Sequence, residues 1–414
     1  MPLIKPFPGL RPSDTRACEV AAPPYDVMTT EEAREMVLRK PWSFLHISRP
    51  EIDLPEDTDP YSPEVYAKGV ENFDRMREEG LLSQDDRPCF YVYRLTMGDH
   101  VQTGIVAAAS VAAYDQHRIR RHELTRPKKE DDRVRQIEAL NAQTGPVFLI
   151  YPSDRVLEGI LADFCGQPAA VDITADDGVR HELWVISEDS HIKRVTNAFD
   201  AMQTLYVADG HHRSAAASRV AAGRRNSRPQ NAGEQPSDYF LTVVFPHDQV
   251  QILDYNRLIR DLNGMEQERF LDRISEGFRV EPQAGPVRPT ETGEFGMYLK
   301  GQWYRLRIDP ARIPEDPVNS LDVSLLTHEL IEPILGITDQ RQDERIDFVG
   351  GIRGLKALQH RVDTGEMAVA FSLCPTTVNA LMAVADAGQI MPPKSTWFEP
   401  KLVDGLVSHL LQAK

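Results

Sequence analysis

A chain of 414 residues, of which 41% are apolar and 27% charged, has the composition of a folded protein with two or three domains. Its 63 acidic and 47 basic residues give a net charge of −16, which disfavours bulk nucleic-acid binding. The apolar stretches are too short to span a membrane, the amino terminus lacks export-signal features, and the four cysteines show no CxxC spacing, so we expect a cytoplasmic protein.

Strand-like and helix-like segments alternate along the chain, which predicts a mixed α/β protein with hairpins. The expected strands are the apolar runs at 90–95, 105–111, 147–151, 183–186, 205–208, 239–245 and 368–373. The expected helices carry apolar residues at three- and four-residue spacing and span 131–143, 154–164, 211–222, 266–278, 321–335 and 378–386. Hairpin turns are predicted at 176–178 and 300–302.

Two polar segments indicate where the chain divides. Residues 223–237 are polar and helix-breaking, which predicts an exposed insertion, and residues 309–319 contain three prolines. We therefore expect a main α/β body at 1–282, a hairpin-bearing subdomain at 283–319, and a segment at 320–414 that returns to the main body.

The first candidate site follows the apolar strand at 205–208. Asp209 and Gly210 would lie at the entrance of an alanine-rich helix, where free backbone N–H groups favour an anion. His212 and Arg213 could add hydrogen-bond donors to a phosphate. In the alternative interpretation Asp209 only caps the helix, and the histidines and Arg213 make surface hydrogen bonds.

The second candidate site is the segment 119–133, in which charges of both signs alternate and Pro127 interrupts any helix. We expect a loop that leads into the helix from Asp131. Its cations Arg121, Arg126 and Lys128 would bind a polyanion, while the acidic Glu123 or Asp132 would hold a cation or act as a base. The alternative is a solvated charged face.

The third candidate site is the segment 391–401. Its tripeptide Lys394, Ser395 and Thr396 matches the last residues of a Walker A motif, but the segment lacks the glycines of that motif. These residues are therefore predicted to line a pocket and not to form a P-loop. His122 and Glu123 begin like the metalloprotease helix but lack a second histidine four positions after the first, so this pair is not a zinc signature.

Seven segments, in order along nearly the whole chain, resemble the bacterial and archaeal family DUF1015. They are VAAPPYDV, SFLHISRPEID, YVYRLTMGDHVQTGIV, HELTRPKKEDDR, YVADGHHR, RIDFVGGIRG and MPPKSTWFEPKL. Within them, Gly210 to Arg213 is similar to the Gly-x-x-Arg phosphate motif of the ParB/sulfiredoxin superfamily, and Asp209 to Arg213 to the version in its free-serine kinases. This resemblance implies a ParB/sulfiredoxin-like nucleotide-binding core, elaborated with further strands, hairpins and helices. The catalytic cysteine of sulfiredoxin is replaced by His211, which excludes sulfinic-acid repair.

The expected function is an ATP- or ADP-dependent phosphotransferase that acts on a small hydroxylated metabolite, with free serine favoured by the resemblance. Phosphates would be bound by Gly210, His212 and Arg213, and Mg²⁺ by Asp209. Glu123 is the expected general base, His211 is a further candidate catalytic residue, and Arg126 and Lys128 would neutralise developing charge. The acceptor or nucleotide would contact Lys394, Ser395 and Thr396.

Two other functions fit the same motifs. One is a nucleotide or phosphometabolite sensor without turnover, which needs the phosphate turn but no base. The other is a nucleotide-dependent DNA-associated protein of the ParB kind, which would need a basic face that the net charge does not promise. The sequence leaves the acceptor, the choice of ATP or ADP, and the oligomeric state open.

Overall fold

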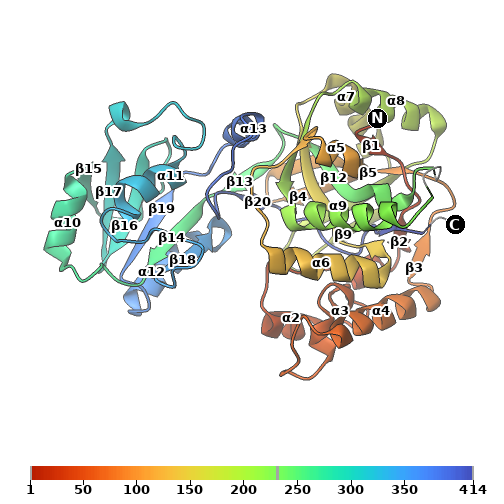
Figure 1. Cartoon of the computed structure of the whole chain (residues 1–414), viewed down its shortest axis with the longest axis horizontal. Helices are drawn as coiled ribbons and strands as arrows, with labels where there is room; N and C mark the ends of the chain where they lie inside the picture. The colour runs from red at the N-terminus through yellow and green to blue at the C-terminus, as the bar shows by residue number, and fades with distance from the viewer. Residues whose placement is uncertain (1, 230–232, 413–414) are drawn as a thin grey trace. The chain divides into compact units, whose positions relative to one another are not determined.

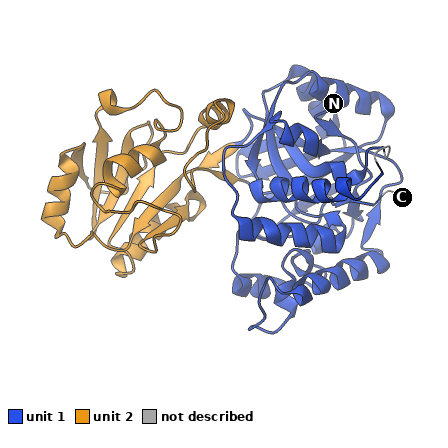
Figure 2. Ribbon diagram, in the orientation of Figure 1, with its two compact units in different colours: residues 1–250, 400–414 blue, residues 251–399 orange. Residues whose placement is uncertain are grey.

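The computed structural model of the chain describes residues 2–229 and 233–412. The chain divides into two compact units, unit 1 at residues 1–250 and 400–414 and unit 2 at residues 251–399 (Figure 2). Unit 2 is therefore inserted between two parts of unit 1. The domain boundaries expected from composition, after residues 282 and 319, both fall inside unit 2.

A mixed sheet forms the centre of unit 1. Within the described residues it contains nine strands in the order β6-β11-β8-β12-β5-β4-β10-β9, with β1 also paired to β5. Their bounds are β1 (Ile4–Lys5), β4 (Phe90–Met97), β5 (His100–Ser110), β6 (Ile119–Arg120), β8 (Val147–Tyr151), β9 (Val171–Thr174), β10 (Arg180–Ile186), β11 (Leu205–Asp209) and β12 (Tyr239–Pro246). Strand β12 is buried along its whole length, which explains its continuous apolar run. The strands expected between residues 90 and 245 are confirmed, as is the hairpin turn between β9 and β10.

Helices cover this sheet and then pack on one another. Helix α9 lies beside α6, and α6 lies beside α4 (Figure 1). The helices of unit 1 are α1 (Ala17–Val20), α2 (Thr30–Val37), α3 (Leu45–Ser48), α4 (Pro63–Glu78), α5 (Val111–Asp115), α6 (Pro127–Leu140), α7 (Arg155–Cys165), α8 (Asp189–Asp200) and α9 (His211–Asn226). Helix α9 extends into the polar segment expected at 223–237, of which residues 230–232 lie outside the described residues. Across the described part of the chain, no helix combines the length and apolarity that crossing a bilayer requires.

Helix α6 begins four residues earlier than expected. Pro127 occupies its first turn instead of ending a loop, because a proline there lacks only an N–H that would have no helical acceptor. Lys128 is therefore a helical residue, and the loop between β6 and α6 is confined to residues 121–126.

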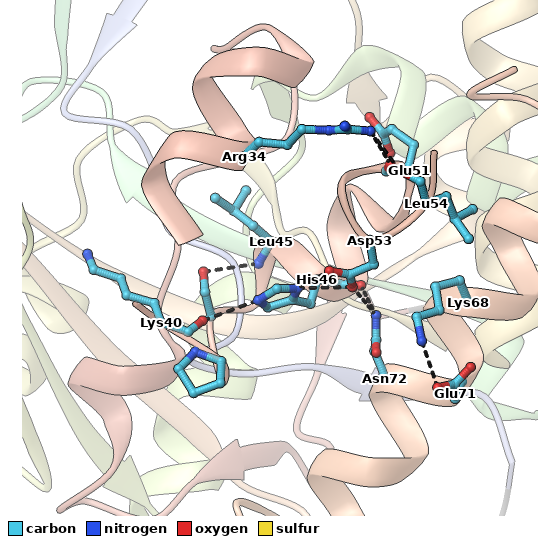
Figure 3. Close-up of polar contacts among 12 residues, drawn as sticks. Arg34, Lys40, Leu45, His46, Glu51, Asp53, Leu54, Lys68, Glu71 and Asn72 are labelled. Carbon is cyan, nitrogen blue, oxygen red and sulfur yellow. Dashed lines mark hydrogen bonds and ion pairs between the residues drawn. The ribbon is translucent and has the colours of Figure 1, made fainter. Parts of the chain in front are cut away.

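An N-terminal helical layer, which the sequence patterns did not predict, has its own polar centre (Figure 3). His46 Nδ1 lies 2.8 Å from a carboxylate oxygen of Asp53, and Asn72 Nδ2 donates to Asp53 at 2.8 Å and to the His46 carbonyl at 2.7 Å. Asn72, on α4, is fully buried and ties the helix to the α3 segment. Two short strand pairs complete unit 1: β2 (Leu10–Pro12) with β3 (Leu82–Gln84), and β7 (Ala142–Gln143) with β21 (His409–Leu410).

We expect Asn72→Ala to lower the free energy of unfolding by about 1–3 kcal/mol, because it leaves a buried carbonyl and a carboxylate oxygen without their donor. Urea denaturation measures the change. Glu71→Ala is the matched control, since Glu71 is exposed on the same helix and pairs with Lys68 at the surface. Equal stability of the two variants would contradict the role assigned to Asn72.

Unit 2 is built on an antiparallel sheet in the order β15-β17-β16-β19-β14-β18. Its strands are β14 (Tyr255–Ile259), β15 (Phe278–Gln283), β16 (Glu294–Leu299), β17 (Gln302–Ile308), β18 (Ile346–Gly350) and β19 (Val369–Leu373), and β13 (Gln251–Leu253) pairs separately with β20 (Trp397–Glu399). Its helices are α10 (Gln267–Ser275), α11 (Asp322–Leu326), α12 (Gly354–Asp363) and α13 (Val378–Asp386), and a π-helical turn at Thr327–Ile331 continues α11. The predicted hairpin is present, but β16 also pairs with β19. Residues 283–319 are therefore part of this sheet and not a separate subdomain.

Candidate functional site

The most distinctive backbone feature of unit 1 is the turn between β11 and α9. The strand ends at Asp209, Gly210 adopts φ +93°, and the helix begins at His211, as the sequence predicted. A Cβ atom on Gly210 would lie 3.2 Å from Nε of Arg213 and 3.3 Å from Cα of Val147. The turn therefore requires glycine both for its left-handed conformation and for the close packing around it.

The α9 N-terminus has the properties of an anion site. Within the described residues no side chain caps this helix, so the N–H groups of its first turn are available to a ligand. Asp209 does not act as the cap, because one of its carboxylate oxygens accepts from the Gly210 N–H, at 2.8 Å, before the helix starts. Its other oxygen accepts from the Lys401 ammonium at 3.2 Å. Burial alone would raise the pKa of Asp209, but the charges of Lys401 and Arg213 hold it well below its usual range.

The loop at 121–126 lies against this turn, although the two segments are far apart in sequence. The backbone N–H of Arg126 donates to Nε2 of His212 at 3.0 Å, so His212 is an acceptor at Nε2. Farther along, Arg219 of α9 pairs with Glu130 at 3.0 Å and Asp131 at 2.7 Å on α6. The first and second candidate segments therefore converge, as the expected roles of Glu123 and Gly210 in one reaction require.

Two histidines and Glu123 meet where the loop reaches the helix. The His122 and His211 rings stand edge to face with centroids 4.5 Å apart. The ligand atoms of His122, Glu123 and His211 all lie within 4.8 Å of one another. Burial lowers the pKa of His122 to about 4, and the nearby Val207 carbonyl acts in the opposite direction. Neither ring nitrogen of His122 is placed to form a hydrogen bond with that carbonyl. Burial also lowers the pKa of His211 well below its ordinary value, and both rings are neutral at pH 7.

Arg213 faces the interior of unit 1 and not open solvent. Its guanidinium donates to the Pro146 carbonyl and lies 4.0 Å from the carboxylate of Asp26. It borders a cavity of about 30 Å³, enough for about two waters. Polar side chains that line the cavity include Tyr25, Arg133, Gln143 and Asp404. Burial raises the pKa of Asp404 to about 7, even though Arg213 acts in the opposite direction.

The remaining predicted residues have their own contacts. Lys128 places its ammonium 4.3 Å from the centroid of the Tyr61 ring. Lys394, Ser395 and Thr396 belong to unit 2, where they precede β20. The Ser395 hydroxyl donates to the Pro392 carbonyl at 2.7 Å, and the Lys394 ammonium lies 5.4 Å from the centroid of the Tyr255 ring.

Three charged residues at the turn and the cavity were not connected with the phosphate turn from the sequence: Asp26, Asp404 and Lys401, the last of which belongs to the segment expected to line a pocket. Asp26 lies in the VAAPPYDV segment and Lys401 in the MPPKSTWFEPKL segment, so both belong to the family resemblance. Sequence position could not connect these residues with Asp209 and Arg213. Lys401 and Asp209, for example, are 192 positions apart in the chain.

The comparisons with solved structures gave weak matches. A free serine kinase variant in complex with AMP matches at 12% identity over 71% of this chain and 86% of that chain, with a TM-score of 0.34. SbnI with a C-terminal truncation, from Staphylococcus aureus, matches at 10% identity over 73% of this chain and 86% of that chain, with a TM-score of 0.38. A conserved hypothetical protein from Pyrococcus furiosus matches at 12% identity over 73% of this chain and 94% of that chain, with a TM-score of 0.35.

The family comparison covers much more of the sequence. No curated protein matches the chain. The family model described as "Protein of unknown function (DUF1015)" matches residues 4–324, which is more than half of the chain and includes both the loop at 121–126 and the turn at Asp209 and Gly210. The chain therefore belongs to the DUF1015 family.

Proposed function

We propose that the protein is a nucleotide-dependent phosphotransferase that acts on a small hydroxylated metabolite, with free serine as the favoured acceptor. One observation carries the proposal: an uncapped helix N-terminus, entered through a left-handed glycine, lies beside a loop that brings Glu123 within 4.8 Å of His211, the first residue of that helix. The helix end supplies the electrostatics of a phosphate site, and the carboxylate supplies a base.

In this proposal the nucleotide phosphates bind the backbone N–H groups that follow Gly210. The side chains of His212 and Arg213 border the same turn, and the Lys401 ammonium adds a positive charge 3.2 Å from a carboxylate oxygen of Asp209. Arg126 and Lys128, at the start of α6, are proposed to neutralise charge that develops on the transferred group.

Phosphoryl transfer then needs positioning and charge stabilisation more than covalent chemistry. Glu123 accepts the proton of the acceptor hydroxyl, the hydroxyl oxygen forms a bond to the terminal phosphorus, and the nucleotide leaves with one phosphate fewer. Asp209 offers the hard oxygen ligand that Mg²⁺ prefers, and the ion would neutralise the phosphates when bound there. His211 remains a candidate catalytic residue, and Lys394, Ser395 and Thr396 remain the predicted substrate-binding residues.

The test is a transfer screen with the full chain and Mg²⁺, using ATP and ADP separately against pooled hydroxylated metabolites that include serine. We expect one new phosphorylated product, phosphoserine, detected by mass spectrometry. Binding of nucleotide without transfer to any acceptor would refute the phosphotransferase and favour the sensor.

We expect Lys401→Met to weaken nucleotide binding by about tenfold, because it removes one charge-assisted phosphate contact while keeping a long side chain. Isothermal titration with ATP and ADP measures the affinity. The control is Lys68→Met, since Lys68 pairs with Glu71 on the surface of α4. Unchanged affinity in Lys401→Met would remove this lysine from the phosphate site.

A further inference from the structure

The meeting point of His122, Glu123 and His211 is a second feature of the turn, and phosphate binding does not explain it. His122 and Glu123 belong to the loop between β6 and α6, and His211 is the first residue of α9. Each contributes one potential ligand atom, and these atoms lie within 4.8 Å of one another. The second histidine that a linear zinc motif would need after His122 is thus supplied by a distant element.

Both imidazoles are buried, and three of their four ring nitrogens have no hydrogen-bond partner among the described residues. His122 is 1% exposed and His211 is 5% exposed. The unpaired atoms, among the described residues, are both ring nitrogens of His122 and Nε2 of His211. An unpaired buried polar group destabilises the folded chain. Two such groups beside a carboxylate favour a ligand that accepts electron pairs from nitrogen.

We propose that His122, Glu123 and His211 bind a divalent transition-metal ion of the zinc class. Imidazole nitrogen suits Zn²⁺ and its neighbours in the first transition row, whereas Mg²⁺ selects oxygen ligands. Two histidines and one glutamate are a known ligand set of catalytic zinc, in which a further coordination position stays open.

The observed spacing is compatible with such an ion after small movements. Ligand atoms about 2.0–2.1 Å from a tetrahedral ion lie roughly 3.4 Å apart. Side-chain rotations that move each ligand atom by about 1 Å would bring the three atoms to that spacing. A carboxylate that binds an ion through one oxygen keeps its second oxygen as a proton acceptor. The ligand role of Glu123 is therefore compatible with its proposed role as a base, and the metal site itself does not depend on the proposed function.

The experiment is a titration of the metal-stripped full chain with Co²⁺, whose visible absorption reports coordination. We expect one Co²⁺ per chain, displaced by Zn²⁺ and not by excess Mg²⁺. Loss of an outer-shell partner alone costs about 10–100-fold in metal affinity, so His122→Asn and His211→Asn should each weaken Co²⁺ binding by at least about 100-fold. Glu123→Gln, at a less buried position, should also weaken binding and guards against misfolding of the histidine variants.

Two matched controls separate this site from buried histidines in general. His181 is 1% exposed and its Nε2 also lacks a hydrogen-bond partner in the described residues, but it lies on β10, outside the cluster. His212 is adjacent to His211, and its Nε2 is occupied by the Arg126 N–H. His181→Asn and His212→Gln should keep wild-type Co²⁺ affinity. Absence of binding in the wild type, or equal binding in the cluster variants and the controls, would overturn the proposal whether or not phosphoryl transfer is found.

Discussion

Glu123→Gln is expected to lower the turnover of phosphoryl transfer by roughly 10²–10⁴-fold and to leave nucleotide affinity within a few-fold. Glutamine keeps the shape of the side chain and removes its ability to accept a proton. The phosphate-binding part of the site lies on the other segment, at Gly210 and the first turn of α9, so it stays intact. Steady-state kinetics give the turnover, and calorimetric titration gives the affinity.

Glu130→Gln is the matched control for this variant. Glu130 lies seven residues later on α6, where it accepts from the Thr125 hydroxyl at 2.7 Å and pairs with Arg219. Its loss should leave turnover close to that of the wild type, because an ion pair with one exposed partner, here Arg219, contributes only about 1 kcal/mol to stability. Undiminished turnover in Glu123→Gln would remove this residue from the mechanism.

His181 and His409 are each expected to contribute a loss of stability as the pH falls from 6.5 to about 4. Burial lowers the pKa of His181 and of His409 from 6.5 to about 4 in each case. Between these values the unfolded chain binds protons that the folded chain does not, so acid favours unfolding. At about 1.4 kcal/mol per pH unit, each histidine contributes up to about 3 kcal/mol, which is present at pH 7 and lost progressively toward pH 4. Asp404 and Asp322 act in the opposite direction over the same range, because burial raises the pKa of each to about 7, so the effect of a histidine is measured by removing it and not from the net stability.

Urea denaturation at several pH values tests this expectation. The quantity compared is the slope of the free energy of unfolding against pH, and not its absolute value. His181→Asn and His409→Asn should each show a shallower loss of stability between pH 6.5 and 4 than the wild type. His117→Asn is the control. His117 is exposed and adopts φ +58°, a conformation that asparagine tolerates, so its slope should match that of the wild type. Identical pH dependence in all four proteins would show that these buried histidines do not control acid stability.

The part of the site that could be predicted from sequence is the part made by neighbouring residues. The turn that follows Leu205–Asp209 could be predicted because a buried strand, a left-handed glycine and an alanine-rich helix are each specified by the local sequence. The approach of the loop at 121–126 was expected on chemical grounds, and its contacts with His211 and His212 confirm that it lies at the turn.

The parts that sequence patterns missed depend on tertiary contacts. Helix α4 buries Tyr66, Gly69 and Asn72 among its apolar residues, so its buried face is not a simple apolar stripe. The boundaries predicted after residues 282 and 319 differ from those of unit 2 because a polar, proline-rich composition marks exposed loops and not necessarily domain borders. Residues 309–319 are such a loop, and they connect β17 to α11 inside one unit. Residues 320–414 were expected to return to the main body, but Lys401 could not be assigned to Asp209, because no local pattern links residues 192 positions apart.

That return also determines when the site can be completed during protein synthesis. At about 5–20 residues per second, a ribosome spends on the order of ten seconds or more on residues 251–399 after it has made the turn at Asp209 and Gly210. Only then do Lys401, the bridge from Asp404 to Ala22, and the strand that pairs with β7 emerge from the exit tunnel. Throughout this interval the nascent first unit lacks the ammonium partner of Asp209 and one wall of the Arg213 cavity. A chain released before residue 400 would therefore carry a folded turn that has neither, and the site matures only after the inserted unit has been translated.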